Sequence, residues 1–198
     1  MIIGLTGGIA TGKSTVSALL AARGALLVDA DVIAREVMLP GHPVLEAVVR
    51  HFGQQVLNQD GTLHRKKLGA IVFANPTERQ ALNDITHPAI RQEIIRRMKA
   101  YEAEFPDKLV VVDTPLLYES GLDKLFHKVI VVYVPREVQL KRLMERDGLT
   151  EEQARQRLDA QMSIEEKKRL ADIVVDNSRE VTFTERQLNE LCERKVFS

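Results

Sequence analysis

Eight residues near the start of the chain have the types and spacing needed to hold a phosphate group. Residues 7–14, Gly-Gly-Ile-Ala-Thr-Gly-Lys-Ser, match the P-loop pattern G-x-x-x-x-G-K-[ST]. Glycines let successive backbone N–H groups turn inward around phosphate oxygens, and the helix that follows directs its positive dipole end at the same anion. We expect Lys13 to reach the β- and γ-phosphates and the Ser14 hydroxyl to bind Mg²⁺. The other predicted nucleotide-binding positions are Gly8, Ile9, Ala10, Thr11, Gly12 and Thr15.

The segments on both sides of this loop fit the strand–loop–helix order that the motif requires. Residues 1–6 form a short apolar run rich in β-branched side chains, which predicts a buried strand. After the loop, Val16, Leu19 and Leu20 recur at helical spacing, and Arg23-Gly24 predicts the end of that helix. A glycine-rich turn that binds no ligand is therefore the weaker interpretation.

Composition limits the class of protein. The chain has 198 residues, 44% hydrophobic and 28% charged, and equal numbers of basic and acidic residues give a formal net charge of zero. Nucleic-acid binders usually carry a basic field, and this chain has none. No apolar run approaches the roughly 18 residues of a membrane span, no signal peptide precedes the first strand, and the single Cys192 excludes an internal disulfide. We expect a cytoplasmic monomer or weak homo-oligomer with no nucleic-acid or membrane partner.

Acidic residues follow two of the predicted strands. Asp29 ends the run at 25–29 and Asp31 follows two residues later, and side chains two apart share a face if the extended geometry persists. This pair is a candidate base or metal site, although one of the two could simply cap the next helix. Arg35, one helical turn after Asp31, could pair with it or bind an anionic substrate. Asp113 ends the run at 109–113 in the manner of a Walker-B acid, which holds Mg²⁺ directly or through water.

Five apolar runs alternate with helical patterns along the chain. This alternation predicts an α/β fold, a doubly wound parallel sheet of the P-loop NTPase type. The runs are 1–6, 25–29, 109–113, 128–134 and 173–176. Within one domain, 1–198, we assign 1–59, 102–134 and 170–198 to the nucleotide-binding core. Residues 60–101 show no strand pattern and are a helical insertion, with helices expected to start at Asn75-Pro76 and at His87-Pro88.

Residues 135–169 carry a charge-rich helix pair. Thr150 and Gln153 form a predicted capping box between its helices, and Thr182 with Glu185 predicts another at the terminal helix. A charge-rich pair is usually a solvated face. The alternative is a mobile lid that brings arginines such as Arg142 over the phosphates.

Several enzyme and switch classes lack their signatures here. The GTPase sequence N-K-x-D is absent, and residues 113–116 lack the glycine of D-x-x-G. No H-E-x-x-H, Cys cluster or G-x-S-x-G is present, which argues against a protein-ligated zinc site and a serine hydrolase. A short P-loop chain with a helical insertion and an arginine-bearing helix pair is typical of a small-molecule kinase of the nucleoside-monophosphate-kinase type.

Motifs over nearly the whole chain resemble the dephospho-coenzyme A kinase family. These motifs occur in the same order as in that family. They are residues 4–9 with 12–15, Asp29-Ala30-Asp31 with 33–35, Phe73-Ala74-Asn75-Pro76, His87-Pro88, residues 115–117 with Glu119, residues 139–143 with Arg146, and Ala171-Asp172 with Asn177. The P-loop alone is generic, and the combination is specific.

The resemblance implies that ATP phosphorylates the ribose 3′-hydroxyl of dephospho-CoA, giving CoA and ADP in the last step of CoA biosynthesis. It also implies that 60–101 binds CoA and that 135–169 is a lid. Asp31 matches the family's candidate base, and Asn177 would lie near the adenosine. Catalytic groups are then Lys13, Asp31 and Arg142; further ATP contacts are Arg146 and Asn177; acceptor-side residues are Asp31, Arg35 and His87; metal ligands are Ser14 and Asp113.

Two alternatives to this assignment remain open. Another P-loop kinase, acting on a nucleoside monophosphate, would share most of these features. An ATP-dependent switch protein is the alternative from a different class. For His87, a role as the residue that starts a helix before Pro88 is an equal alternative.

Overall fold

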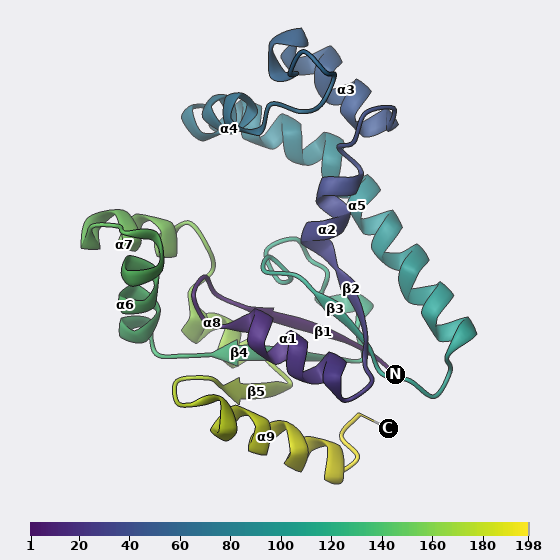
Figure 1. The fold of residues 1–198 in the computed structure, drawn as a ribbon, viewed down its shortest axis with the longest axis vertical. Coiled ribbons are helices and arrows are strands. Elements are labelled where there is room, and N and C mark those ends of the chain that lie inside the picture. Colours follow the sequence, from purple (N-terminus) through teal and green to yellow (C-terminus); the bar gives the residue numbers. More distant parts are fainter. Residues whose placement is uncertain (198) are drawn as a thin grey trace. The chain divides into compact units, whose positions relative to one another are not determined.

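A five-stranded parallel sheet organises the chain, as the computed structural model of residues 1–197 shows (Figure 1). The strand order is β2-β3-β1-β4-β5, and the pairs β1–β3, β1–β4 and β4–β5 are parallel. Their bounds are β1 Ile2–Gly7, β2 Leu26–Asp29, β3 Val110–Asp113, β4 Lys128–Tyr133 and β5 Ile173–Asp176. Later strands lie on both sides of β1, so the P-loop that follows β1 lies where the strand order reverses, the usual ligand position in such sheets. The predicted doubly wound fold is confirmed.

The chain divides into two compact units. One comprises residues 1–28 and 98–197 and contains the sheet with α1 Lys13–Ala22, α6 Arg136–Asp147, α7 Glu151–Asp159, α8 Ile164–Leu170 and α9 Val181–Glu193. The other comprises residues 29–97 and contains α2 Ala30–Glu36, α3 Pro43–Phe52, α4 Arg65–Ala74 and most of α5 Pro76–Glu104. Short 3₁₀ turns lie at Gln54–Val56 and Asp123–Leu125. None of the helices within residues 1–197 is long and apolar enough to cross a membrane.

The core of the sheet-bearing unit lies between one face of the sheet and two helices. Alternate residues of β1 point into it, as the period of two along a strand requires. The buried members are Ile3, Leu5, Val16, Leu20, Val111, Ile130, Val132, Val175 and Leu188, from four strands with α1 and α9. Packing on this face fixes the strands, and with them the loops that leave their carboxyl ends.

The helix α5 runs without interruption through Pro88. Asn75 accepts the Thr77 N–H at 2.9 Å, which confirms the predicted start at Asn75-Pro76. The second helix start predicted at His87-Pro88 is wrong. The alternative role of His87, as the residue that starts a helix before Pro88, is therefore wrong as well. A proline inside a helix removes one N–H and crowds the preceding turn, but packing on both sides can hold the helix together. Here the Thr86 hydroxyl bonds the Leu82 carbonyl at 2.9 Å within that turn.

The capping predictions have mixed outcomes. The box at Thr150 is confirmed, because Thr150 Oγ1 accepts the Gln153 N–H at 3.3 Å and Gln153 Oε1 accepts the Thr150 N–H at 3.0 Å. The box at Thr182 is wrong, because α9 already begins at Val181 and Thr182 lies inside its first turn. Residues 135–169 also form more than the predicted pair of helices, since α8 follows α7.

Candidate active site

The P-loop has the backbone of an anion-binding nest. It leaves the end of β1 and enters α1, and both Ala10 and Gly12 have left-handed backbone angles, with φ of 61° and 77°. Left-handed residues alternating with right-handed ones turn successive N–H groups into a concavity. The first turn of α1 then adds the positive end of the helix dipole. This local geometry matches the loop shape that the P-loop motif predicts.

Three side chains from distant parts of the same unit hold the backbone of this loop. Gln139 on α6 donates to the Ile9 carbonyl at 2.8 Å, and Gln161 after α7 accepts the Ile9 N–H at 3.1 Å. Asn177, after β5, donates to the Thr11 carbonyl at 2.8 Å. The loop's shape therefore depends on α6, on the α7–α8 connection and on the end of β5, as well as on its own sequence.

Asn177 connects the P-loop to Arg142. The buried Asn177 amide accepts the Thr184 hydroxyl at 2.8 Å, which orients it, and the Asn177 carbonyl accepts Arg142 Nη2 at 3.0 Å. Arg146 instead bonds Asp147 at 2.7 and 3.1 Å. Of the two predicted phosphate-covering arginines, the structure therefore brings Arg142 to the neighbourhood of the P-loop and ties Arg146 to α6's own last residue.

The contact between Gly12 and Asn177 gives a testable consequence. A Cβ at Gly12 would lie 2.2 Å from Asn177 Nδ2, at a φ that L-residues rarely adopt. Backbone strain of this kind costs about 1–3 kcal/mol. We expect Gly12→Ala to weaken binding of a fluorescent ATP analogue by about tenfold or more.

Gly24 supplies the matched control for this prediction. Its φ is 91°, and nothing lies within 4 Å of its would-be Cβ. Gly24→Ala therefore carries the backbone strain without the collision, away from the loop, and should bind the analogue as the unmodified chain does. Unchanged affinity in Gly12→Ala would contradict the described loop geometry.

Lys13 and Asp113 form an ion pair beside the loop. Lys13 is the first residue of α1, and Asp113 is the buried last residue of β3, which the sheet register sets opposite Leu5 of β1. Ser14 follows Lys13 and is exposed in the same first turn. A hydroxyl and a carboxylate are hard oxygen donors of the kind Mg²⁺ takes, and Mg²⁺ usually completes its shell with water and substrate phosphates. The two side chains therefore fit the predicted metal, while within residues 1–197 no group of three or more His, Cys, Asp and Glu side chains could hold an ion.

Sequence reasoning missed both glutamines that hold Ile9. Gln139 had a signal: it lies four residues before Leu143, on the buried face of α6, and a buried amide must find a partner. Gln161 had none, because it sits in an irregular connection between two charged helices. Lys167 on α8 was missed for a related reason, since it stands in a run of charged residues that resembles a solvated surface.

The remaining predicted residues belong to the unit of residues 29–97. Asp29 caps α2, since its carboxylate accepts the N–H groups of Asp31 at 2.8 Å and Val32 at 3.0 Å. The alternative that one of the two aspartates is a helix cap thus holds for Asp29. Asp31 lies exposed in the first turn of α2 and Arg35 exposed in its last turn, and His87 is exposed on α5.

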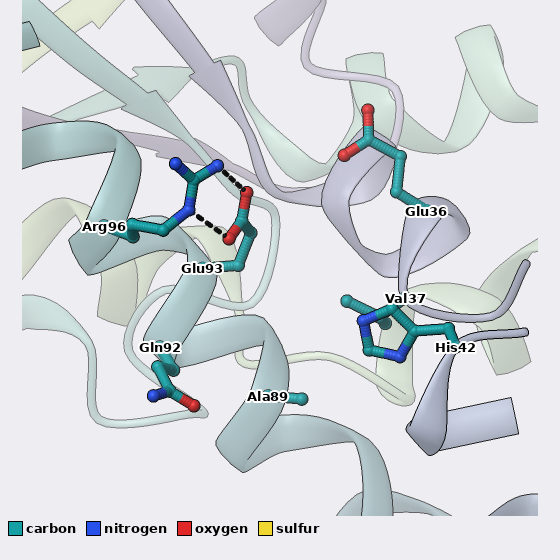
Figure 2. A pocket seen from close by; sticks show the side chains of 7 residues that line it. All are labelled: Glu36, Val37, His42, Ala89, Gln92, Glu93 and Arg96. Atoms are coloured by element: carbon teal, nitrogen blue, oxygen red, sulfur yellow. Dashed lines mark hydrogen bonds and ion pairs between the residues drawn. The ribbon is translucent and has the colours of Figure 1, made fainter. Parts of the chain in front are cut away.

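A cavity of about 440 Å³ lies within this second unit (Figure 2). Arg96 makes two hydrogen bonds of 2.7 Å to Glu93 on one side of it, and Glu36 and His42 lie across from them. Its lining residues are Glu36, Val37, His42, Ala89, Gln92, Glu93 and Arg96. The cavity therefore combines charged groups with small apolar ones and lies next to the segment that bears Arg35.

Arg96 and Arg97 both hold the Glu93 carboxylate. Arg97 donates to it at 2.8 Å and also pairs with Glu36. Hydrogen bonding from Arg96, with a further contribution from Arg97, lowers the pKa of Glu93 from 4.5 to about 2. The folded state therefore favours the ionised form of Glu93. Its contribution to stability is fully present when the pH is above the pKa of the unfolded state, and it is lost as the pH falls from 4.5 toward 2.

We therefore expect the difference in unfolding free energy between the unmodified chain and Glu93→Gln to shrink across that pH window. Urea unfolding followed by circular dichroism at a series of pH values measures it. Glu102→Gln, an exposed position on the same helix, should show a small and pH-independent difference. A constant difference for Glu93→Gln down to pH 2.5 would contradict the assigned ion pairs.

The chain is similar to known proteins along nearly its whole length. The family model for dephospho-CoA kinase matches residues 1–182. The dephospho-CoA kinases of Carboxydothermus hydrogenoformans and Bacillus licheniformis are 46% and 49% identical over 193 and 194 residues. These matches cover 98% of this chain and 93% and 96% of the two relatives.

Solved structures give the same result. Dephospho-CoA kinase from Campylobacter jejuni aligns with a TM-score of 0.75 and 35% identity, covering 97% of this chain and 95% of that one. Shikimate kinase from Acinetobacter baumannii, at 17% identity and a TM-score of 0.52 over 98% of this chain and 94% of that one, shares the fold. The family model and the dephospho-CoA kinase relatives show that the chain belongs to the dephospho-CoA kinase family, whose kinases catalyse the final ATP-dependent step of coenzyme A biosynthesis.

Proposed function

We propose that this chain transfers the γ-phosphoryl group of ATP to the ribose 3′-hydroxyl of dephospho-CoA, giving CoA and ADP. The observation that carries the proposal is the Lys13–Asp113 ion pair beside a P-loop with left-handed backbone angles at two residues. Arg142 lies close by, bound to the carbonyl of Asn177. Family membership supplies the acceptor's identity.

On the donor side, each residue has a role that follows from its place. Backbone N–H groups of residues 8–15 receive the phosphates, and Lys13 exchanges its contact with Asp113 for one with the β- and γ-phosphates. Mg²⁺, held through Ser14 and Asp113, would neutralise charge on the phosphates. Arg142 would cover the transferring group, with Arg146 as a further ATP contact. Asn177 would lie near the adenosine while it holds the loop.

On the acceptor side, Asp31 would orient the 3′-hydroxyl and accept its proton. Such a base must form a hydrogen bond to the hydroxyl during transfer, and Asp31 lies exposed in the first turn of α2. Arg35 and His87 would bind the anionic groups of the acceptor. We assign the CoA moiety to the helical insertion 60–101, and the cavity that Arg96 and Glu93 line is a candidate recess for it.

Residues 135–169 would act as a lid. Closing over bound ATP excludes water from the transferring group, which suppresses hydrolysis. The contacts of Gln139, Gln161 and Arg142 support this role, because all three belong to 135–169 and reach the P-loop or its neighbour Asn177. We further propose a cytoplasmic monomer or weak homo-oligomer.

An ADP-release assay with ATP and Mg²⁺ tests the function. Dephospho-CoA should stimulate ADP release and gain one phosphate per ADP formed, as mass spectrometry of the acceptor measures. AMP, other nucleoside monophosphates and no acceptor are the comparisons. Stimulation by a nucleoside monophosphate in place of dephospho-CoA would identify a different P-loop kinase. ADP release without any phosphorylated acceptor would indicate an ATP-dependent switch.

A further inference from the structure

One lysine of the sheet-bearing unit is completely enclosed. The side chain of Lys167 on α8 has 0% exposed surface. Its Nζ lies 2.6 Å from the Pro115 carbonyl, 2.9 Å from Glu119 Oε1 and, at the limit of a hydrogen bond, 3.5 Å from the Gly7 carbonyl. An ammonium group has three donors, so each has an acceptor here. Burial lowers the pKa of Lys167, and the bond to Glu119 opposes that shift.

The acceptors belong to segments that border the P-loop. Gly7 is the first residue of the P-loop motif, and Pro115 follows Asp113 by two positions. The Pro115 carbonyl also accepts the Thr6 hydroxyl at 3.2 Å. Glu119 accepts the N–H of Met162, two residues before α8, at 3.1 Å. One side chain therefore joins the start of the P-loop, the loop after β3 and the beginning of α8.

Stability alone does not explain a charge in this place. A buried ion pair loses most of its attraction to the cost of removing both charges from water, and an apolar side chain of similar volume avoids that cost. What the lysine provides is a fixed geometry between two carbonyls and a carboxylate. That geometry extends to the loop itself, because Gln161, just before Met162, accepts the Ile9 N–H.

We propose that Lys167 is a positioning residue for phosphoryl transfer. It holds α8 and the loop after Asp113 against Gly7, and so sets the backbone that receives the phosphates. It does not touch the reacting atoms. The proposal rests on the kinase function proposed for this chain and assigns a determinant of its rate.

The test separates geometry from stability with two substitutions in the full-length chain. In Lys167→Met, the misplaced loop should lower kcat by about 10²-fold. The KM for dephospho-CoA should stay close to that of the unmodified enzyme. Glu119 also loses its ion pair in this variant, so the midpoint of thermal unfolding should fall. In Lys167→Met with Glu119→Gln, no unpaired charge remains and the glutamine still accepts the Met162 N–H, so the midpoint should recover while kcat stays low.

Two further variants complete the design. Glu119→Gln alone keeps both carbonyl contacts of Lys167, and kcat should stay near that of the unmodified enzyme. Lys168→Met removes the same charge from the next residue of α8, which is exposed and lies over the Tyr133 ring, and should leave kcat unchanged.

Recovery of kcat together with the unfolding midpoint in the double variant would overturn the proposal, because the lysine would then be structural only. A loss in Glu119→Gln as large as in Lys167→Met would also overturn it. The unmodified chain is assayed alongside with ATP and dephospho-CoA. If the unmodified chain forms no CoA, the proposed function fails, and binding of a fluorescent ATP analogue then tests the role of Lys167. Weaker binding of the analogue by the double variant would support the positioning role. Unchanged binding would overturn that role.

Discussion

Replacing Lys13 by alanine is expected to lower kcat for CoA formation by about 10³-fold or more, comparable with the largest losses from removing one preorganised donor. Lys13 is the one side chain of the P-loop motif that brings a full positive charge, and its partner Asp113 is buried at the end of β3. During transfer, negative charge moves toward the β–γ bridge, where this ammonium would stand. Initial rates of ADP release at saturating ATP and dephospho-CoA measure the effect.

The fold of this variant needs its own check, because Asp113 loses its ion pair. Circular dichroism and the unfolding midpoint establish whether the sheet survives in Lys13→Ala. Lys141→Ala is the matched control: this exposed lysine on α6 contacts only Glu145, at 4.0 Å, among the ion pairs of residues 1–197. Near-normal turnover in a folded Lys13→Ala chain would remove the P-loop from the proposed chemistry.

The second large effect is expected at Asp31. Asp31→Asn keeps the size of the side chain but removes the group that accepts the hydroxyl proton, and general-base catalysis contributes about 10²–10⁴-fold to rate. We therefore expect kcat to fall within that range while the KM for ATP changes little. Circular dichroism and the unfolding midpoint establish that this variant is folded.

Asp29 provides the control for this prediction. Its carboxylate caps α2, and asparagine caps helices about as well as aspartate. Asp29→Asn should therefore retain both fold and kcat. A large loss of kcat in Asp29→Asn with little change in Asp31→Asn would transfer the base role to the other aspartate. An effect of Asp31→Asn confined to the KM would make Asp31 a binding residue.

Most of the sheet was predictable because its signals are local. Each strand is a short apolar run that ends in a polar residue or a turn, and the P-loop fixes the order of strand, loop and helix around residues 7–14. Parallel order followed from the alternation of strands with helices. The cap at Asn75 and the capping box at Thr150 were predictable for the same reason, since side chain and backbone partner lie within three residues of each other.

The errors arose where distant packing decides the outcome. Pro88 has a strong local preference to end a helix, yet α5 continues through it. The helix α9 begins at Val181 with Glu180 as its N-cap, one residue before the Thr182 pattern. Lys167 and Gln161 acquire their contacts from segments far away in sequence, and charged or irregular surroundings give no periodic signal for that.

The site shows the same division. The P-loop and Asp113 lie together as the sequence predicts, because β1 and β3 are neighbouring parallel strands that end at one edge of the sheet. The roles of Asp31, Arg35 and His87 remain predictions, since they depend on a bound acceptor. Asn177 was expected beside the adenosine, and its hydrogen bond to the Thr11 carbonyl gives it a second task that only the folded chain reveals.

The position of the transferred phosphate tests the central claim most directly. The chain is incubated with ATP, Mg²⁺ and dephospho-CoA, and the product is analysed by mass spectrometry and phosphorus NMR. The proposed function predicts one added phosphate, on the ribose 3′-oxygen, in equal amount to the ADP formed. It also predicts that a 3′-deoxy analogue of dephospho-CoA accepts none. A phosphate at another position, or ADP formed with no phosphorylated product, would contradict the account.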